Sequence, residues 1–201
     1  MKVSAVVLGA GASTRMGRQK LLLPFGGEPL VRRTVRRVID AGFEDVLVVL
    51  GFEHERAAAA LEGLACRTVV NPDYATGMGS SFRTAVGHLG DSQAALFALA
   101  DQPFVGPEHY RRLPDAYRAR PSGIVCVKYG TVTAPPHLFD REFFPELAAL
   151  VHGARSVLER HADRLTVLQF PEELLVDIDT PEEYARAISR LAAGEGSSGA
   201  R

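Results

Sequence analysis

The sequence predicts a three-layer α/β/α fold with a mainly parallel sheet, built as a single domain. Short, continuous apolar runs rich in Val, Leu and Ala are typical of buried strands. Amphipathic stretches alternate with these runs, as expected for a parallel sheet covered by helices. The 201 residues contain neither an internal repeat nor a long linker. We place the domain at residues 1–192 and expect a disordered, Gly- and Ser-rich tail at 193–201.

The first half of the chain alternates strands with helices. VSAVVL predicts a buried strand at 3–8, and EPLVRRTVRRVIDAG predicts an amphipathic helix that its final glycine stops. DVLVVLG predicts a second strand at 45–51, and an alanine-rich helix follows at 53–61. CRTVVN predicts a third strand. SSFRTAVGHLG predicts a third helix with Ser80 or Ser81 as its N-cap.

The second half is less regular. AALFALADQPF predicts a fourth strand that ends at Asp101, and GIVCVKY predicts another. After an irregular stretch, LTVLQF and LLVDIDT predict two more strands. A last helix is expected from Pro181 to about Leu191.

Composition excludes several classes of partner. Charged residues make up 23% and the net charge is -1, so no basic nucleic-acid surface is expected. No apolar run approaches the roughly 20 residues of a membrane span, and the first apolar run is too short for a signal peptide. Cys66 and Cys126 are far apart and lie in apolar contexts, which predicts buried free thiols in a reducing compartment. We therefore expect a cytoplasmic protein that binds neither nucleic acid nor membrane.

The stretch LGAGASTRMGRQK, residues 8–20, directly follows the first strand and resembles a phosphate-binding loop. It does not fit the dinucleotide pattern G-x-G-x-x-G/A, because Thr14 stands at the sixth position. It does not fit the P-loop pattern either, because Lys20 follows Gln19 and precedes Leu21. Neither common type of phosphate loop explains this segment.

Its residue types nevertheless suit a polyphosphate. Gly9 and Gly11 are interpreted as a sharp turn that brings backbone N–H groups close to a ligand. Arg15 and Lys20 place two positive charges on the same short segment. The alternative is an ordinary strand-to-helix turn whose cations are solvated.

Acidic residues stand at two later positions where a metal ligand could lie. Asp101 directly follows the apolar run LFALA, although it could equally be a turn or cap residue. Asp177 and Asp179 are two apart, so a strand would point both to one face and Ile178 to the other. The alternative is that Asp179 or Thr180 only caps the following helix.

The opening motif, L-G-A-G-x-S-T-R-M-G-x-x-K-L-L-L-P, closely resembles the N-terminal signature of nucleotidyltransferases with the glycosyltransferase-A-type fold. That is a Rossmann-like nucleotide-diphospho-sugar transferase fold. GGEPLV, NPDYATGMGSSFRTAV, LADQPFV and DIDTPEEY agree with it in order, so the resemblance covers most of residues 1–190. The combination of GMGSS, ADQPFV and DIDTPEEY is most similar to the molybdenum-cofactor cytidylyltransferases among the MobA-like NTP transferases.

This resemblance implies transfer of CMP from CTP to molybdopterin, with Mg²⁺ as cofactor and pyrophosphate as the second product. A recipient molybdoenzyme or its chaperone is a further candidate partner. The resemblance also implies a base and ribose site, a triphosphate site and a metal site, with catalytic roles for three of their residues. The base and ribose site would comprise the backbone of Leu8, Gly9, Ala10 and Gly11 together with Ser80. The triphosphate site would comprise the catalytic residues Arg15 and Lys20. The metal site would comprise the catalytic residue Asp101 with Asp177 or Asp179.

The sequence departs from the family pattern on the side expected to bind the acceptor. Relatives usually carry Gly-Asn or Gly-His before PVLF, whereas this chain has VTAPPHLF at 132–139. His152 stands where a Gly-Asp commonly precedes GAR. His137 and His152 could contact an acceptor phosphate, although lone histidines more often lie on the surface. The acceptor is therefore less specified than the reaction type.

Two other functions stay open. The chain could transfer GMP or another nucleotide to a different phosphorylated acceptor, because base choice depends on loops 8–11 and 76–81. It could instead be a non-catalytic nucleotide-binding accessory protein in cofactor insertion. A pure binding protein would not need the second metal carboxylate, which favours an enzyme. Oligomeric state and the recipient enzyme are not specified by the sequence.

Overall fold

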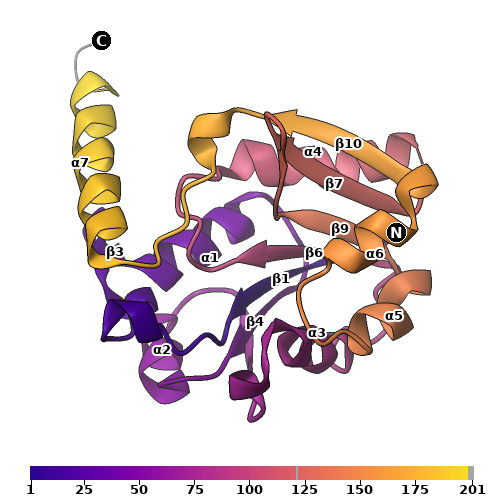
Figure 1. Ribbon diagram of the computed structural model, residues 1–201, viewed down its shortest axis with the longest axis horizontal. Coiled ribbons are helices and arrows are strands. Elements are labelled where there is room, and N and C mark those ends of the chain that lie inside the picture. Colours follow the sequence, from indigo (N-terminus) through magenta and orange to yellow (C-terminus); the bar gives the residue numbers. More distant parts are fainter. Residues whose placement is uncertain (121, 199–201) are drawn as a thin grey trace.

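A central sheet with helices on both faces forms the body of the protein (Figure 1). In the computed structural model, residues 1–120 and 122–198 are described, and within them eight strands form this sheet in the order β10-β7-β9-β6-β1-β4-β5, with β8 paired to β7. The strands are β1 Val3–Gly9, β4 Val46–Leu50, β5 Arg67–Val70, β6 Ala94–Leu99, β7 Ile124–Tyr129, β8 Val132–Thr133, β9 His137–Asp140 and β10 Leu165–Phe170. A separate hairpin pairs β2 Pro24–Phe25 with β3 Glu28–Pro29.

Strand β1 lies at the centre of the sheet because both of its faces are apolar. Ala5 and Val7 pack into one core cluster, and Val6 and Leu8 pack into the other, as the two-residue period of a strand requires. β1 pairs in parallel with β4 and β6, whereas β9 runs antiparallel between β6 and β7. The predicted three-layer fold with a mainly parallel sheet is confirmed.

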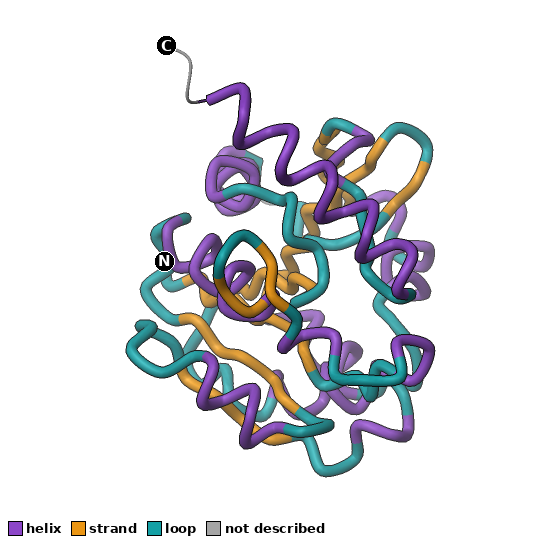
Figure 2. The backbone as a smooth tube through the Cα atoms, turned by 90° about the vertical axis from the view of Figure 1, so that its left-hand side faces the viewer, coloured by secondary structure: helices purple, strands orange, loops and turns teal. Residues whose placement is uncertain are grey.

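Helices cover the two faces in separate groups. On one face lie α1 Leu30–Asp40, α2 His54–Ala60 and α4 Pro107–Ala119, and on the other lie α3 Met78–Val86, α5 Phe144–Ala148 and α6 Arg155–Arg160. Helix α7, Pro181–Ser198, stands beside the sheet, and in Figure 2 it runs diagonally across the front of the molecule. Its Tyr184 hydroxyl donates to the carbonyl of Pro24, 2.5 Å away. No helix within the described residues is long and apolar enough to cross a membrane.

The first predicted helix matches α1 closely. Leu30, Val31, Val35 and Val38 are buried along one stripe, as the 3.6-residue period predicts. The helix ends at Asp40, and Gly42 follows with a positive φ of 87°, the left-handed conformation that favours glycine after a helix.

Several predicted boundaries are wrong. Helix α3 starts at Met78, so neither Ser80 nor Ser81 is its N-cap; that position belongs to Gly77, whose φ of 117° suits glycine. Strand β6 ends at Leu99 because the chain turns at 100–101 and leaves the sheet before Asp101. LLVDIDT forms no strand, since residues 175–179 pair with none of the described strands.

Other elements were not predicted, and one is longer than predicted. Between β7 and β10 the chain forms β8, β9, α5 and α6, where the sequence indicates little regularity. Helix α7 continues to Ser198, so 193–198 are helical where a disordered tail is expected. Each residue added to an established helix gains a backbone hydrogen bond, which offsets low local propensity. The rest of the expected tail, 199–201, lies outside the described residues.

Candidate functional site

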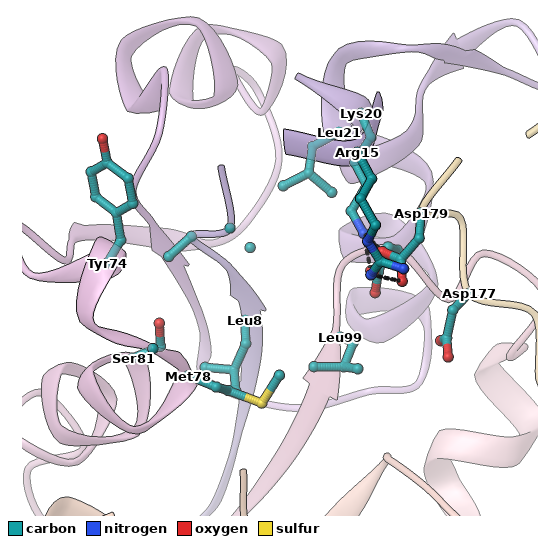
Figure 3. A pocket seen from close by; sticks show the side chains of 15 residues that line it. Leu8, Arg15, Lys20, Leu21, Tyr74, Met78, Ser81, Leu99, Asp177 and Asp179 are labelled. Carbon is teal, nitrogen blue, oxygen red and sulfur yellow. Dashed lines mark hydrogen bonds and ion pairs between the residues drawn. The ribbon is translucent and has the colours of Figure 1, made fainter. Parts of the chain in front are cut away.

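A cavity of about 470 Å³ lies at the carboxyl ends of β1 and β6 (Figure 3). In open α/β sheets this edge is where ligands bind. The first loop contributes its backbone, and charged side chains gather at one end while Tyr74, Met78 and Ser81 lie at the other, with Leu8 and Leu99 between them. The sequence-predicted residues that line this cavity are Leu8, Gly9, Ala10, Gly11, Arg15, Lys20, Asp101, Asp177 and Asp179.

Lys20 connects three segments that are far apart in the sequence. Its Nζ donates to Oδ2 of Asp101 at 2.5 Å and to Oδ1 of Asp179 at 2.6 Å. The side chain is only 12% exposed. Burial lowers the pKa of Lys20, but the two carboxylates outweigh burial, so its pKa is raised above the ordinary value. Lys20 is therefore charged at neutral pH and holds both acids together.

Arg15 reaches the same cluster from the solvent side. Its Nη2 donates to Oδ2 of Asp179 at 2.6 Å, while its side chain is 69% exposed. Burial alone would raise the pKa of Asp179, but Lys20 and Arg15 lower it below its usual value. An exposed ion pair contributes little to stability, so the Arg15 guanidinium can turn to another anion at small cost.

Asp177 is held differently, by an amide. The buried side chain of Gln102 donates from Nε2 to Oδ1 of Asp177 at 2.9 Å. Desolvation raises the pKa of Asp177, the Gln102 hydrogen bond opposes this, and the negative charges of Asp101 and Asp179 raise it further. Gln102 therefore fixes the orientation of a carboxylate that its acidic neighbours would repel. In the sequence this glutamine lies within ADQPFV, a segment that carries the family resemblance, but its role as the partner of Asp177 was not predicted.

The donor set fits a magnesium ion that arrives with a triphosphate. Across residues 1–120 and 122–198, no group of three or more His, Cys, Asp or Glu side chains is arranged to hold a metal. Asp101 and Asp179 instead each place an oxygen within 2.6 Å of the same Lys20 ammonium. Magnesium usually takes one or two carboxylates together with substrate phosphates and water. Two carboxylates around one replaceable cation meet that requirement.

The first loop turns at positions other than those predicted. Positive φ angles occur at Ser13 and Gly17, at 52° and 69°, rather than at Gly9 or Gly11. Gly9 serves close packing instead, because a Cβ there would lie 3.1 Å from Leu21 Cδ1. The sharp turn expected at the first two glycines therefore falls further along the loop.

Gln19 organises the loop and was not predicted to have a role. Its Oε1 accepts from the Ser13 hydroxyl at 2.8 Å and from the Leu21 N–H at 3.3 Å, and its Nε2 donates to the Phe52 carbonyl at 2.7 Å. These bonds fix the start of the short 3₁₀ turn Lys20–Leu22. The buried amide thus sets the direction from which Lys20 enters the cavity.

At the opposite end, Ser81 rather than Ser80 lines the cavity. The Ser80 hydroxyl is buried; it donates to the Gly77 carbonyl and accepts from the Asn71 amide at 2.8 Å. Helix α3 starts two residues earlier than expected, which turns Ser80 inward. Tyr74 also lines this end, and its ring lies 6.4 Å from that of Phe52.

The start of α7 shows which of the two residues caps this helix. The Thr180 hydroxyl accepts from the N–H of Glu183, and the Glu183 carboxylate accepts from the N–H groups of Asp179 and Thr180, both at 2.9 Å. Thr180 and Glu183 therefore form a capping box. The carboxylate of Asp179 is not used as the cap, and it points to Lys20 and Arg15 instead.

The remaining candidates lie in different environments. His137, expected on the surface, is buried at the start of β9, because its side chain shares a face with Phe139 inside the second core cluster. His152 is exposed. Cys126 is buried and Cys66 half-buried, and both are free thiols. Burial raises the pKa of both thiols, as expected for unreactive cysteines.

The fold and the gathered charges define a nucleotidyltransferase: a backbone-lined edge of a parallel sheet, with cations and carboxylates meeting in one cavity. The sequence profile of the MobA-like NTP transferase domain matches residues 5–165. This chain belongs to the MobA-like NTP transferase family.

Individual relatives carry several names. Nicotine blue oxidoreductase of Paenarthrobacter nicotinovorans is 30% identical over 92% of this chain and 96% of that protein. A probable molybdenum cofactor guanylyltransferase of Natronomonas pharaonis is 28% identical, over 94% and 98%. The molybdenum cofactor cytidylyltransferase of Escherichia coli K12 is 23% identical, over 94% and 96%. The crystal structure of Rv0371c from Mycobacterium tuberculosis H37Rv in complex with manganese superposes with a TM-score of 0.78 at 29% identity, covering 94% of this chain and 99% of that one.

Proposed function

We propose that this chain transfers the CMP group of CTP to the phosphate of molybdopterin and releases pyrophosphate. One observation carries the proposal: the Lys20 ammonium lies between Asp101 and Asp179, in a cavity lined by the backbone of 8–11. Such a site can hold a triphosphate with its cation and still admit a second anion. The relatives named as molybdenum cofactor transferases support the acceptor, and the cytidylyltransferase supports the base.

The reaction needs no nucleophile from the protein. An oxygen of the acceptor phosphate attacks the α-phosphorus of the triphosphate, and a new P–O bond forms there. The bond from the α-phosphorus to the oxygen bridging to the β-phosphate breaks, and its electron pair leaves with pyrophosphate. The protein must hold two anions that repel each other and neutralise the charge on the leaving group.

Lys20 and Arg15 would perform that neutralisation. When a triphosphate enters, its oxygens compete with Asp101 and Asp179 for the Lys20 ammonium, and the exposed Arg15 guanidinium can bind a phosphate as a planar fork. Mg²⁺ held by Asp101 and Asp179, with Asp177 beside them, would neutralise oxygens near the reacting phosphorus. The backbone of 8–11 and the Ser81 hydroxyl would bind the nucleoside.

The chain's compartment and domain limits belong to the same proposal. Two free thiols support a reducing compartment, and we infer the cytoplasm. We treat residues 1–192 as one catalytic unit. A recipient molybdoenzyme or its chaperone would receive the product.

Pyrophosphate release tests the proposed function. The assay uses CTP, GTP and ATP in separate reactions, each with and without molybdopterin, in the presence of Mg²⁺. We expect release with CTP and molybdopterin together. Equal release with GTP would contradict the cytidine assignment, and release with another phosphorylated acceptor alone would contradict molybdopterin. CTP binding without turnover would favour the alternative function of a non-catalytic accessory protein. Turnover of a redox substrate, with no pyrophosphate release, would favour an oxidoreductase activity like that named for the P. nicotinovorans relative.

The variant Asp101→Asn tests the role proposed for the Asp101 carboxylate. We expect it to abolish turnover while the thermal unfolding midpoint stays close to that of the wild type. Asp91→Asn is the control, because Asp91 is an exposed carboxylate whose partner is Lys2, outside the cavity. Normal turnover by Asp101→Asn would contradict the role given to this carboxylate.

A further inference from the structure

A second cavity, of about 160 Å³, adjoins the first on the face of the sheet covered by α3 and α6. Leu8, Met78 and Leu99 line both cavities, so the two spaces meet at these side chains. Figure 3 shows these three residues at the lower boundary of the first cavity. An apolar cavity of about 150 Å³ is large enough for one six-membered ring. The second space therefore has the size of a single ring.

Its lining is aromatic and aliphatic. Phe82 comes from α3, Phe97 from β6 and Phe139 from β9. The ring centroids of Phe82 and Phe97 are 4.9 Å apart, and those of Phe97 and Phe139 are 6.1 Å apart. Leu158 of α6 and Ala154 before it close the other side. Aromatic rings prefer to meet other flat rings in offset-stacked or edge-on contacts, which add to the gain from burying apolar area. The lining therefore favours a flat, uncharged occupant.

Few polar side chains line the second cavity, and the buried one among them, His137, is uncharged near neutral pH. They are those of Thr133, His137 and Arg155, and the exposed Arg155 guanidinium pairs with Glu159 at 2.8 Å. The His137 ring lies edge-on to Phe139, with centroids 6.3 Å apart, and its Nδ1 accepts from the N–H of Val127 at 3.4 Å. Burial lowers the pKa of His137 to about 4, so the imidazole is neutral near pH 7.

We propose that this second cavity holds one planar, uncharged ring of the acceptor, whose phosphate reaches the neighbouring cavity near Lys20. This inference rests on the proposed function, because it assigns the two joined cavities to two parts of one acceptor. A ring with a polar edge toward His137 and Thr133 fits best. Every further polar atom buried there without a hydrogen-bond partner would weaken binding. A fused heterocycle would therefore enter with one ring and leave the polar atoms of its other ring outside.

The two residues of β8 provide a matched pair of variants. Thr133 lines the second cavity, whereas the adjacent Val132 is 51% exposed and lies outside the lining. Strand neighbours point to opposite faces, so Thr133→Trp fills the cavity mouth and Val132→Trp adds the same indole on the other side. Both positions are exposed, so neither change disturbs the core.

Binding without turnover tests the inference separately from the proposed function. Calorimetry measures phenyl phosphate, 6-hydroxymethylpterin and inorganic phosphate against wild type, Thr133→Trp and Val132→Trp. We expect at least one ring-bearing probe to bind wild type and Val132→Trp alike and Thr133→Trp at least tenfold more weakly, with inorganic phosphate unaffected. The preferred probe distinguishes a plain aromatic ring from a pterin. Equal binding to all three proteins, or no ring binding to wild type, would overturn the inference.

Steady-state kinetics then shows whether the second cavity binds the acceptor or the nucleotide. With an active acceptor, Thr133→Trp should raise the acceptor KM at least tenfold and change the triphosphate KM less than twofold. A rise in the triphosphate KM alone would overturn the inference, because the cavity would then hold the nucleobase. Ring binding that depends on Thr133 in a protein releasing no pyrophosphate would refute the proposed function and leave a ring-binding site. Pyrophosphate release with no effect of Thr133→Trp would refute only the inference.

Discussion

The two joined cavities are built in opposite ways. The charged one brings Arg15, Lys20, Asp101 and Asp179 together from segments up to 164 residues apart in the sequence, and each cation is held by a named carboxylate. The apolar one extends the second core cluster, and packing alone shapes it. Buried charges need specific partners, whereas apolar side chains need only matching volume. We therefore expect single substitutions to affect the charged cavity more strongly.

Lys20→Met should give the largest effect. Without the ammonium, Asp101 and Asp179 repel each other, and the leaving pyrophosphate loses one of the cations proposed to neutralise it. Removing one such stabilising group usually costs about 10²- to 10³-fold in rate. We expect a loss of that size in pyrophosphate release, with binding of 6-hydroxymethylpterin unchanged. Lys2→Met is the control, since Lys2 pairs with Asp91 outside both cavities. A loss below threefold would remove Lys20 from the reaction.

His137 should make the apolar cavity sensitive to acid. Its folded pKa of about 4 lies below the ordinary 6.5, so below pH 6.5 the unfolded chain binds a proton that the native ring refuses. Stability should fall as pH drops from about 6.5 to about 4, by up to about 3 kcal/mol.

Urea unfolding at pH 7.0 and 4.5 measures that loss. His137→Leu should flatten the difference between the two pH values, whereas His152→Leu, at an exposed position, should preserve it. If His137→Leu and wild type lose the same stability on acidification, the buried ring is not responsible.

Gln102→Ala should give the smallest of the three effects, about tenfold in kcat, or about 1.4 kcal/mol. The amide orients Asp177 through one hydrogen bond, so its loss should also raise the Mg²⁺ concentration needed for half-maximal rate. Adding Asp177→Asn to Gln102→Ala should cost little more, because the two side chains act as a pair. Gln93→Ala, at an exposed glutamine, is the control. Fully additive losses would show that Gln102 acts independently of Asp177.

The charged cavity was the more predictable of the two. Arg15, Lys20, Asp101 and Asp179 have residue types that indicate phosphate or metal chemistry. The parallel strands β1 and β6 bring the first loop and Asp101 to one edge of the sheet, whereas Asp179 follows no strand. No role was predicted for Gln19 or Gln102, although Gln102 lies in ADQPFV, because their amides act through partners such as Phe52 and Asp177 that are distant in sequence.

The apolar cavity could not be predicted for a related reason. Phe82, Phe97 and Phe139 are indistinguishable in sequence from other core residues, and β8, β9, α5 and α6 are each six residues or fewer. Elements this short show too few periods for an apolar pattern, and tertiary packing decides their conformation. Of the two alternatives given for His137, contact with an acceptor phosphate or a surface position, the surface position is wrong, because this packing is not evident from the sequence.

One strand that runs against its neighbours, β9, contributes side chains to the second cavity and none to the first. Because β9 is antiparallel to β6, its first residue, His137, faces Phe97 near the end of β6. The connection before β9, residues 130–136, contributes Thr133 and Pro135 to the lining of the second cavity and no residue to that of the first. Insertions or deletions in that connection could diversify the accepted partner molecule through evolution, while the machinery that handles the triphosphate is inherited intact.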